Sequence, residues 1–418
     1  MRDLKLEIRD FGPIKNCKIN IGSFNVTTGK QSSGKSTVAK SLYLFLLLKD
    51  GLGRLAFEFH HPGYLSDGKG ASLNTKFKIY IHDTFEQIFG FKNSISRDGS
   101  FLRMDYTDYI YIQLIQNKSL SVSYSNKLRD FVSYLENKEG DSLEKSYNES
   151  IQKEIDEFFE MDYSPVYIPA GRSLMTIMGN QFELFYSTLN DDNKKLIDLC
   201  NQNYYLTIMR LKPLFSKALS KIWNNRYGNG VLEKAKPYYD NVLNGEYYYS
   251  NGEEYLLLKD GQKISVNVAS SGQQESLWIY NILLYYTHDS IKKFYIIEEP
   301  ESNLFPESQQ LITKFLGLIS NYDNPILINT HSPYVLGELN NMIFASTLNG
   351  KKKRKSFEII EKNCQLEFDI LRAYFVENGV LIDCMDKEIK QIDNTKLDSI
   401  SGVINEEYDK LLDIARGE

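Results

Sequence analysis

Apolar and polar positions alternate from the beginning of the chain, and this pattern predicts a β-hairpin as the first element. The alternation runs from Leu4 to Ile21 and is interrupted once, at Gly12-Pro13. Period-two alternation on both sides of a glycine–proline turn is typical of two antiparallel strands. We therefore expect residues 4–21 to form a hairpin.

After residue 21, the spacing of apolar residues alternates between that of β-strands and that of α-helices. Phe24–Thr28 reads as a short strand and Val38–Leu48 as an apolar helix. Two short alternating runs, Lys76–Ile81 and Ser119–Tyr124, predict antiparallel strands. Apolar positions at helical spacing from Leu143 to Phe159 predict an amphipathic helix.

The second half of the chain alternates between helical and extended patterns. Ser164–Pro169 reads as a short buried strand, and residues 180–224 lack strand-like alternation, so we expect two or three packed helices there. Gly245–Val268 alternates around two turn signals and predicts a β-hairpin. The apolar runs Lys293–Ile297 and Pro325–Ile328 are typical of buried parallel strands. The chain is therefore predicted to be α/β, with a mixed sheet, antiparallel strands and an inserted helical lobe.

Composition narrows the class of protein without identifying it. The 418 residues exceed what one hydrophobic core usually organises, so we expect two lobes. With 42% hydrophobic and 25% charged residues, the chain reads as a folded globular protein. A net charge of −6 argues against a surface coated by nucleic acid, although a local basic groove is compatible with it.

Cysteine spacing and hydropathy favour a reduced, cytoplasmic setting. The four cysteines lie far apart and form no C-x-x-C pair, which suggests neither a zinc site nor a disulfide framework. The charged N-terminal segment does not read as a signal peptide. The apolar run Leu42–Leu48 is far shorter than the roughly 20 residues that a bilayer requires, so no membrane association is expected.

Residues 29–37 match the phosphate-binding pattern G-x-x-x-x-G-K-[ST], between a predicted strand and a predicted helix. Glycines let the backbone N–H groups and the helix N-terminus face phosphate oxygens. Lys35 would reach the β- and γ-phosphates of ATP, and the Ser36 hydroxyl would ligate Mg²⁺. The residues predicted to bind the nucleotide here are Gly29, Lys30, Ser32, Ser33, Gly34, Lys35, Ser36 and Thr37.

Two glutamates follow the apolar run Lys293–Ile297, as in a Walker B strand. Ligands of parallel sheets bind beyond the carboxyl ends of the strands. Glu298 would hold the magnesium ion, through water, and Glu299 would polarise the attacking water as general base. A solvated acidic strand end is the alternative, which the phosphate loop in the same chain disfavours.

Two further segments could face the same phosphates. Ser270-Ser271-Gly272 opens a predicted helix, where such a turn serves either as an anion site or as an ordinary N-cap. His331 ends the strand after the glutamates, where a neutral imidazole could reach the γ-phosphate or the attacking water.

In order and spacing these motifs resemble those of ABC-type ATPase domains, over most of the chain. Within that superfamily the sequence resembles the soluble heads of SMC and RecF proteins, and most of all the ATPase part of OLD-family proteins. The segments that carry the resemblance are Phe11–Ile14, Tyr167–Arg172, Ser270–Gln273, Glu298–Glu301 and Thr330–Pro333.

The resemblance implies an ABC-ATPase head that acts as a head-to-tail dimer. Ser270 and Gly272 of one subunit would contact the γ-phosphate held by the other, and His331 would be the switch histidine. Ser302–Leu304 would form the loop that crosses the dimer interface. Relatives often carry a histidine before the following proline, where this chain has Phe305, which puts a role for that position in doubt.

One nucleotide-contacting position has two candidates. Arg172 matches the arginine of the family pattern Y-x-P-A-x-R, near the place where ABC enzymes keep their glutamine loop. Gln113, which follows Tyr109-Ile110-Tyr111-Ile112, is the alternative for that role.

The resemblance also divides the chain into four parts. Residues 1–170 and 269–350 would form the ATPase lobe, residues 171–268 a helical insertion with a β-hairpin, and residues 351–418 a C-terminal extension. OLD proteins carry a Toprim nuclease, whose metal-binding carboxylates we do not find after His331; the nearest candidates are Glu377-Asn378-Gly379, Asp383 and Asp386, which read as a hairpin turn and a solvated edge. Lys351–Lys355 reads as a charged loop, with contact to a phosphate backbone as the alternative.

These observations predict an ATPase that needs ATP and Mg²⁺ and switches by dimerisation. Stand-alone heads of this kind resemble the ATPase subunits of bacterial anti-phage systems such as Septu and PARIS, so we expect self-association and a separate effector protein such as a nuclease. The alternative is a DNA-repair or chromosome-maintenance ATPase that binds DNA directly. A transporter subunit is disfavoured because the segment between the phosphate loop and the signature turn, which is Ser270–Gly272, is about twice the length that a transporter head usually has.

Overall fold

The computed structural model describes the chain except for residues 1–3, 62–69, 91–95, 139–143, 175, 177–183, 185, 195–196, 217–229, 394–405, 409 and 412–418. Its strands are β1 (Leu4–Phe11), β2 (Ile14–Ile21), β3 (Phe24–Gly29), β4 (Ser96–Asp105), β5 (Tyr111–Gln116), β6 (Leu120–Tyr124), β7 (Ser164–Ile168), β8 (Gly245–Ser250), β9 (Glu253–Leu258), β10 (Lys263–Ser265), β11 (Lys293–Glu298), β12 (Ile326–Thr330), β13 (Leu371–Glu377), β14 (Val380–Asp383), β15 (Met385–Asp386) and β16 (Gln391–Ile392).

Helices connect most of these strands. They are α1 (Lys35–His60), α2 (Leu73–Phe89), α3 (Asn126–Glu136), α4 (Glu144–Phe159), α6 (Asp191–Lys194), α7 (Leu199–Leu211), α9 (Val231–Leu243), α10 (Ser271–His288), α11 (Pro306–Ser320), α12 (Pro333–Thr347) and α13 (Gly350–Ser356). Short 3-10 segments lie at η2 (Lys212–Ser216), η3 (Val266–Val268), η4 (Lys362–Cys364) and η5 (Phe368–Ile370).

One mixed sheet organises the described part of the chain. Its 11 strands lie in the order β6-β5-β4-β1-β2-β14-β13-β3-β12-β11-β7. The half from β6 to β2 is antiparallel, whereas β13, β3, β12, β11 and β7 are parallel to one another. The α/β class with a mixed sheet and antiparallel strands is therefore confirmed. Strands β8–β10 form a separate small sheet.

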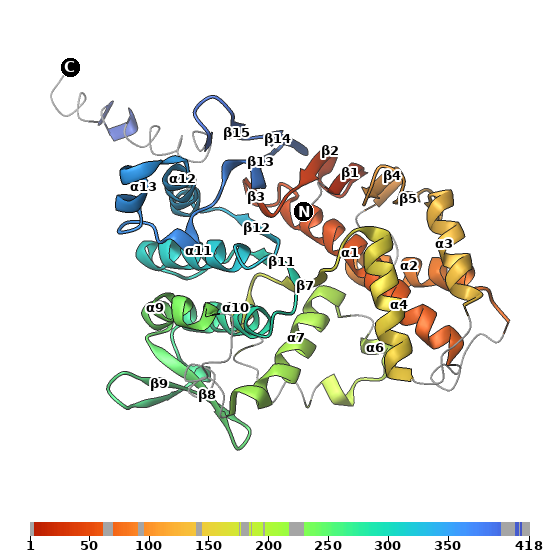
Figure 1. Ribbon diagram of the computed structural model, residues 1–418, viewed down its shortest axis with the longest axis horizontal. Helices are drawn as coiled ribbons and strands as arrows, with labels where there is room; N and C mark the ends of the chain where they lie inside the picture. The colour runs from red at the N-terminus through yellow and green to blue at the C-terminus, as the bar shows by residue number, and fades with distance from the viewer. Residues whose placement is uncertain are drawn as a thin grey trace.

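The parallel strands are buried on both faces. In β11, Phe294 and Ile296 belong to the core that α1, α2, α3 and α4 cover, whereas Tyr295 and Ile297 belong to the core under α9, α10, α11 and α12. The two groups of helices lie on opposite sides of these strands in Figure 1. Burial on both faces explains why β11 and β12 read as continuous apolar runs rather than as alternating ones.

Most predicted elements are present. The hairpin over residues 4–21 is confirmed as β1 and β2, and the predicted strand, helix and hairpin at residues 119–124, 143–159 and 245–268 appear as β6, α4 and β8–β10. Within residues 180–224, α6, α7 and η2 are described and the rest lies outside the described residues.

The prediction of a strand at Lys76–Ile81 is wrong, because this segment lies within helix α2. Phe77 and Ile81 are fully buried one helical turn apart, whereas Ile79 is 53% exposed. A window of six residues fits both periods, and the N-cap at Ser72, which accepts a bond from the Thr75 amide, lies outside it.

The prediction of a loop at Lys351–Lys355 is also wrong, because these residues form most of helix α13. Lysine and arginine have high intrinsic helix propensity, and a run of them is compatible with a short exposed helix.

Among the described helices, none combines the length and hydropathy that a bilayer crossing requires.

The end of the chain contributes strands to the main sheet. Residues 371–383, which the sequence placed in a C-terminal extension, supply β13 and β14, which lie between β3 and β2. The predicted hairpin turn at Glu377-Asn378-Gly379 is confirmed, since Glu377 pairs with Val380. At Gly379 the φ angle is +82°, and the carbonyl accepts bonds from the amides of Lys15 and Asn16 at 2.8 and 3.1 Å.

We predict that Gly379→Ala destabilises the protein. A Cβ atom at this position would lie 2.5 Å from the Pro13 carbonyl oxygen, in a left-handed conformation that alanine disfavours. We expect a loss of about 2 kcal/mol or more in the free energy of unfolding, measured by denaturant titration. Gly337→Ala is the control, because Gly337 lies in α12 with open space around its Cβ position. It should gain roughly 0.5–1 kcal/mol; equal behaviour of the two variants would contradict the close contact.

Candidate functional site

A cavity of about 450 Å³ lies at the carboxyl ends of β3, β12 and β11. Parallel strands end at the same edge of a sheet, so the segments after them converge there. The residues that line the cavity are Pro13, Gln31, Ser32, Ser33, Gly34, Lys35, Ser36, Thr37, Ala170, Glu298, Glu299, Asn329 and His331.

The phosphate loop joins β3 to α1. Gly34 is the N-cap of α1 with a φ angle of 114°, and no side chain caps this helix. A Cβ atom on Gly34 would lie 2.4 Å from the Ile14 side chain, so the loop packs closely against the β1–β2 turn. The hydroxyl oxygen of Ser33 is buried and has no hydrogen-bond partner among the described residues. An uncapped helix N-terminus and an unsatisfied hydroxyl in a glycine loop fit a phosphate.

Lys35 is folded back on its own loop. Its ammonium donates hydrogen bonds to the carbonyls of Gly29 and Lys30 at 2.9 and 2.8 Å. Burial lowers the pKa of Lys35 below its usual value, against the attraction of Glu299, Glu298 and Glu301. Gly29 and Lys30 thus take part through backbone atoms that hold the lysine.

The two glutamates after β11 have different surroundings. Glu298 is buried, and its carboxylate accepts bonds from the Ala170 amide and the Asn329 side chain, both at 3.4 Å. The Glu299 side chain is 40% exposed, accepts a bond from the Ser302 hydroxyl at 3.0 Å, and lies 3.5 Å from the His331 ring. The first is fixed within the wall, and the second is open to the cavity, as a metal-ordering group and a general base would need to be.

His331 occupies the end of β12, opposite the phosphate loop. Burial lowers the pKa of its imidazole below 6.5, the Lys35 cation lowers it further, and Glu299 opposes both effects. The backbone amide of His331 donates to the Glu301 carboxylate at 2.9 Å, which also accepts from the Thr330 hydroxyl at 2.6 Å. Burial raises the pKa of Glu301, and this carboxylate holds the turn that carries the histidine.

Sequence reasoning missed Asn329 and Glu301 as members of the site. The Asn329 side chain accepts a bond from the Thr27 hydroxyl and donates to Glu298, so it ties β3 and β12 to β11. Glu301 is the last residue of the segment Glu298–Glu301, and Asn329 directly precedes the segment Thr330–Pro333. The available signal for Asn329 was a polar residue near the end of an apolar strand, because a buried polar side chain needs a hydrogen-bond partner.

Besides Gly29 and Lys30, three predicted contact residues lie outside the cavity wall. Ser270 is the N-cap of α10 and forms a capping box with Gln273. Gly272 is buried against the loop after β11, since a Cβ atom there would lie 2.8 Å from the Asn303 carbonyl oxygen. Arg172 is fully buried and bonds to protein groups, as described below. Its alternative, Gln113, lies in β5 and accepts a bond from Arg103 at 3.4 Å.

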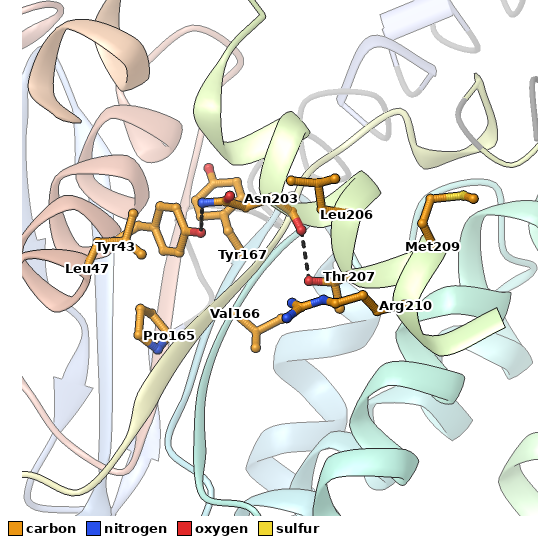
Figure 2. A pocket seen from close by; sticks show the side chains of 10 residues that line it. All are labelled: Tyr43, Leu47, Pro165, Val166, Tyr167, Asn203, Leu206, Thr207, Met209 and Arg210. Atoms are coloured by element: carbon orange, nitrogen blue, oxygen red, sulfur yellow. Dashed lines mark hydrogen bonds between the residues drawn. The ribbon is translucent and has the colours of Figure 1, made fainter. Parts of the chain in front are cut away.

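A second cavity, of about 600 Å³, lies between α1, β7 and α7. Figure 2 shows that Asn203 bonds to the Tyr43 hydroxyl across it, and that the Thr207 hydroxyl bonds to the Asn203 carbonyl. Arg210 and Tyr167 also line it. None of the motif residues predicted to bind nucleotide lines this cavity, although it is larger than the cavity at the phosphate loop.

The geometry defines a P-loop protein, in which a phosphate loop, two acidic groups and a histidine from three parallel strands face one cavity. Residues 1–336 match the family described as "AAA ATPase domain". The chain therefore belongs to this ATPase family.

Two solved structures resemble the structure of this chain, at low sequence identity. The SMC head domain from Thermotoga maritima is 13% identical with a TM-score of 0.38, and the match covers 92% of this chain and 98% of that one. The SmcHead bound to the C-winged helix domain of ScpA is 11% identical with a TM-score of 0.42, covering 91% of this chain and 97% of that one. A comparison with curated proteins finds no significant match.

We predict opposite shifts of the His331 pKa in two variants. Lys35→Met removes a repelling cation and should raise the pKa, whereas Glu299→Gln removes an attracting anion and should lower it. NMR titration of the histidine ring protons measures both, with the His331 signal assigned by its loss in His331→Gln. Unchanged midpoints in both variants would show that these three groups do not share a cavity in solution.

Proposed function

We propose that the protein binds ATP in this cavity, hydrolyses it, and uses the cycle to form and release a head-to-tail homodimer. The observation that carries the proposal is the convergence of Lys35, Glu298, Glu299 and His331 on one cavity at the phosphate loop. Membership of an ATPase family supports the choice of nucleotide. Slow hydrolysis would make the protein a switch rather than a metabolic enzyme.

Each residue has a role that its surroundings support. Lys35 would exchange the loop carbonyls for the β- and γ-phosphates. Ser36 and Glu298 would hold Mg²⁺, which supplies charge neutralisation for the phosphates when bound. Glu299 would act as general base, because it is the more exposed carboxylate and lies beside His331. His331, kept neutral by its surroundings, would hold the attacking water or the γ-phosphate.

The surface around the signature turn supports the dimer. Gly272 packs against Asn303, and the neighbouring Val268 and Phe305 are 77% and 71% exposed. Large apolar side chains exposed on either side of such a contact are typical of a surface that a partner covers. We therefore infer that Phe305, where relatives carry histidine, contributes apolar contact across the interface, with Ser270 facing the partner's nucleotide.

We predict that Glu299→Gln retains ATP binding, hydrolyses at least about 100-fold more slowly, and accumulates as a dimer. The amide keeps the shape of the side chain but cannot accept the proton of the attacking water. Phosphate release and size-exclusion chromatography with ATP measure the two effects. Lys35→Ala is the control and should lose nucleotide affinity instead. Hydrolysis by Glu299→Gln at the wild-type rate would remove Glu299 from the role of base.

We further propose that the output belongs to a separate effector in a bacterial anti-phage system. The sequence resemblance to stand-alone ATPase subunits supports this assignment. The prediction is that affinity capture of Glu299→Gln from phage-infected host cells co-purifies an effector, such as a nuclease, in an ATP-dependent manner. Capture of the protein alone, with and without infection, would contradict it.

Direct binding of DNA is the second candidate, and one structural feature favours it. Helix α13 presents Lys351, Lys352, Arg354 and Lys355 on the surface. Basic side chains of this kind contact phosphate backbones and give a binding constant that falls steeply with salt. Nuclease treatment during the capture separates the two candidates. Loss of the co-purified material after this treatment would indicate that DNA was bound, whereas its retention would indicate a protein effector.

A further inference from the structure

Arg172 was expected at the nucleotide, yet its guanidinium is fully buried and bonded to protein groups. It donates to the carbonyls of Pro169 at 2.7 Å, Glu298 at 2.5 Å and Glu299 at 2.9 Å. Its Nε donates to the Glu275 carbonyl at 2.9 Å and lies 3.2 Å from the Glu275 carboxylate. At least four of the five N–H donors of the guanidinium are therefore engaged, and a phosphate would have to displace them.

These bonds join two parts of the proposed site that are distant in the sequence. On one side are the backbone carbonyls of Glu298 and Glu299, the metal-ordering residue and the base. On the other side is Glu275, in the first turns of α10, three residues after Gly272. The Glu275 carboxylate also accepts hydrogen bonds from the backbone amides of Arg172 and Ser173 at 3.2 and 3.1 Å. Both the side chain and the backbone of Arg172 are therefore fixed to Glu275, and this set of bonds forms a bridge between the two parts.

The backbone of Glu299 makes this bridge sensitive to the position of the base. Glu299 has a φ angle of 44°, in the left-handed region that non-glycine residues seldom occupy. Its amide donates to the Asn329 carbonyl at 2.8 Å and its carbonyl accepts from Arg172. A residue held in a strained conformation by bonds on both sides passes displacement to its partners, because the backbone between them cannot relax freely.

Helix α10 supplies the other half of the connection. The helix has 18 residues, and its N-cap Ser270 forms a capping box with Gln273. These bonds fix the first turn of α10 to the signature turn. Gly272 also packs against the segment after β11, because a Cβ atom at Gly272 would lie 2.8 Å from the Asn303 carbonyl oxygen. The signature turn is thus held against that segment at two points, one through Arg172 and one through Gly272.

We propose that Arg172 is a positioning residue that couples the catalytic glutamates of one subunit to its own signature turn, and hence to the nucleotide of the partner. The inference rests on the proposed function. A shift of Glu299 during hydrolysis would move its carbonyl, the guanidinium and then α10, which would withdraw Ser270 and Gly272 from the second nucleotide. Arg172 touches no substrate in this scheme and acts only through the groups that it joins.

Arg172→Lys tests the coupling. An ammonium presents three donors from one point and cannot reach Glu275 and both carbonyls together. We expect ATP affinity to stay within about threefold of the wild type, because the phosphate loop is untouched, while kcat falls about tenfold or more. In the Glu299→Gln background, whose main-chain carbonyl is unchanged, we expect the dissociation constant of the ATP-bound dimer to rise about tenfold.

Two further variants keep the test decisive. Glu275→Gln keeps an oxygen acceptor but loses the charge, so it should show the same separation of kcat from ATP affinity at smaller size, and it carries the test if Arg172→Lys does not fold. Lys212→Gln breaks another buried ion pair, Lys212–Glu254 at 2.6 Å, outside the cavity wall. It should lower thermal stability and leave kcat unchanged below the unfolding temperature.

The outcomes separate this inference from the function on which it rests. A wild-type protein that neither binds nor hydrolyses ATP would overturn the proposed function. A wild-type protein that does both, with an Arg172→Lys variant that keeps its kcat and dimer affinity, would overturn only the coupling. Equal loss of kcat in Arg172→Lys and Lys212→Gln, or a loss of ATP affinity that accounts for the loss of kcat, would do the same.

Discussion

Parallel pairing of β3 with β12 and of β12 with β11 determines where chemistry can occur in this protein. The registers place Thr28 beside Thr330 and Glu298 beside Asn329. The residues just beyond these pairs therefore meet at one edge without depending on the conformation of long loops. A shift of one residue in either pairing would turn side chains to the opposite face and separate the buried Asn329 from its partners Thr27 and Glu298.

Polar groups at this edge are buried at a cost that hydrogen bonds offset. Asn329 links Thr27 to Glu298, and Glu301 holds both Thr330 and the amide of His331. Each such bond contributes roughly 1 kcal/mol net, but an unpaired member would cost more than its bond had gained. The strained backbone of Glu299 adds a further cost of about 1–3 kcal/mol. The stable sheet therefore maintains a site that, taken alone, would relax.

The parts that could be read from sequence are those whose signal is local. The phosphate loop, the two acids after β11 and the histidine after β12 each follow a contiguous apolar strand, and continuous burial makes such strands recognisable. The helix at Lys76–Ile81 was missed because its cap and its next buried turn lie outside the window. The contacts of Arg172 were not predictable, because its partners Glu275, Glu298 and Glu299 lie more than 100 residues away and all three accept bonds through backbone carbonyls. A side-chain pattern carries no information about a bond to a carbonyl.

Charge balance constrains how the proposed site can work. The cavity is lined by the carboxylates of Glu298 and Glu299 and by one ammonium, that of Lys35, so it holds more negative than positive side-chain charge. A triphosphate adds further negative charge, which the loop amides and the α1 N-terminus offset only in part. Under the proposed function, a divalent cation would therefore be needed for ATP binding as well as for hydrolysis, and Glu298 and Ser36 are the residues that would hold it. In the proposed cycle, the same excess of carboxylates would disfavour retention of free phosphate after hydrolysis. A site that would admit ATP only with its cation would thus also favour loss of the product, which would give the proposed switch a direction.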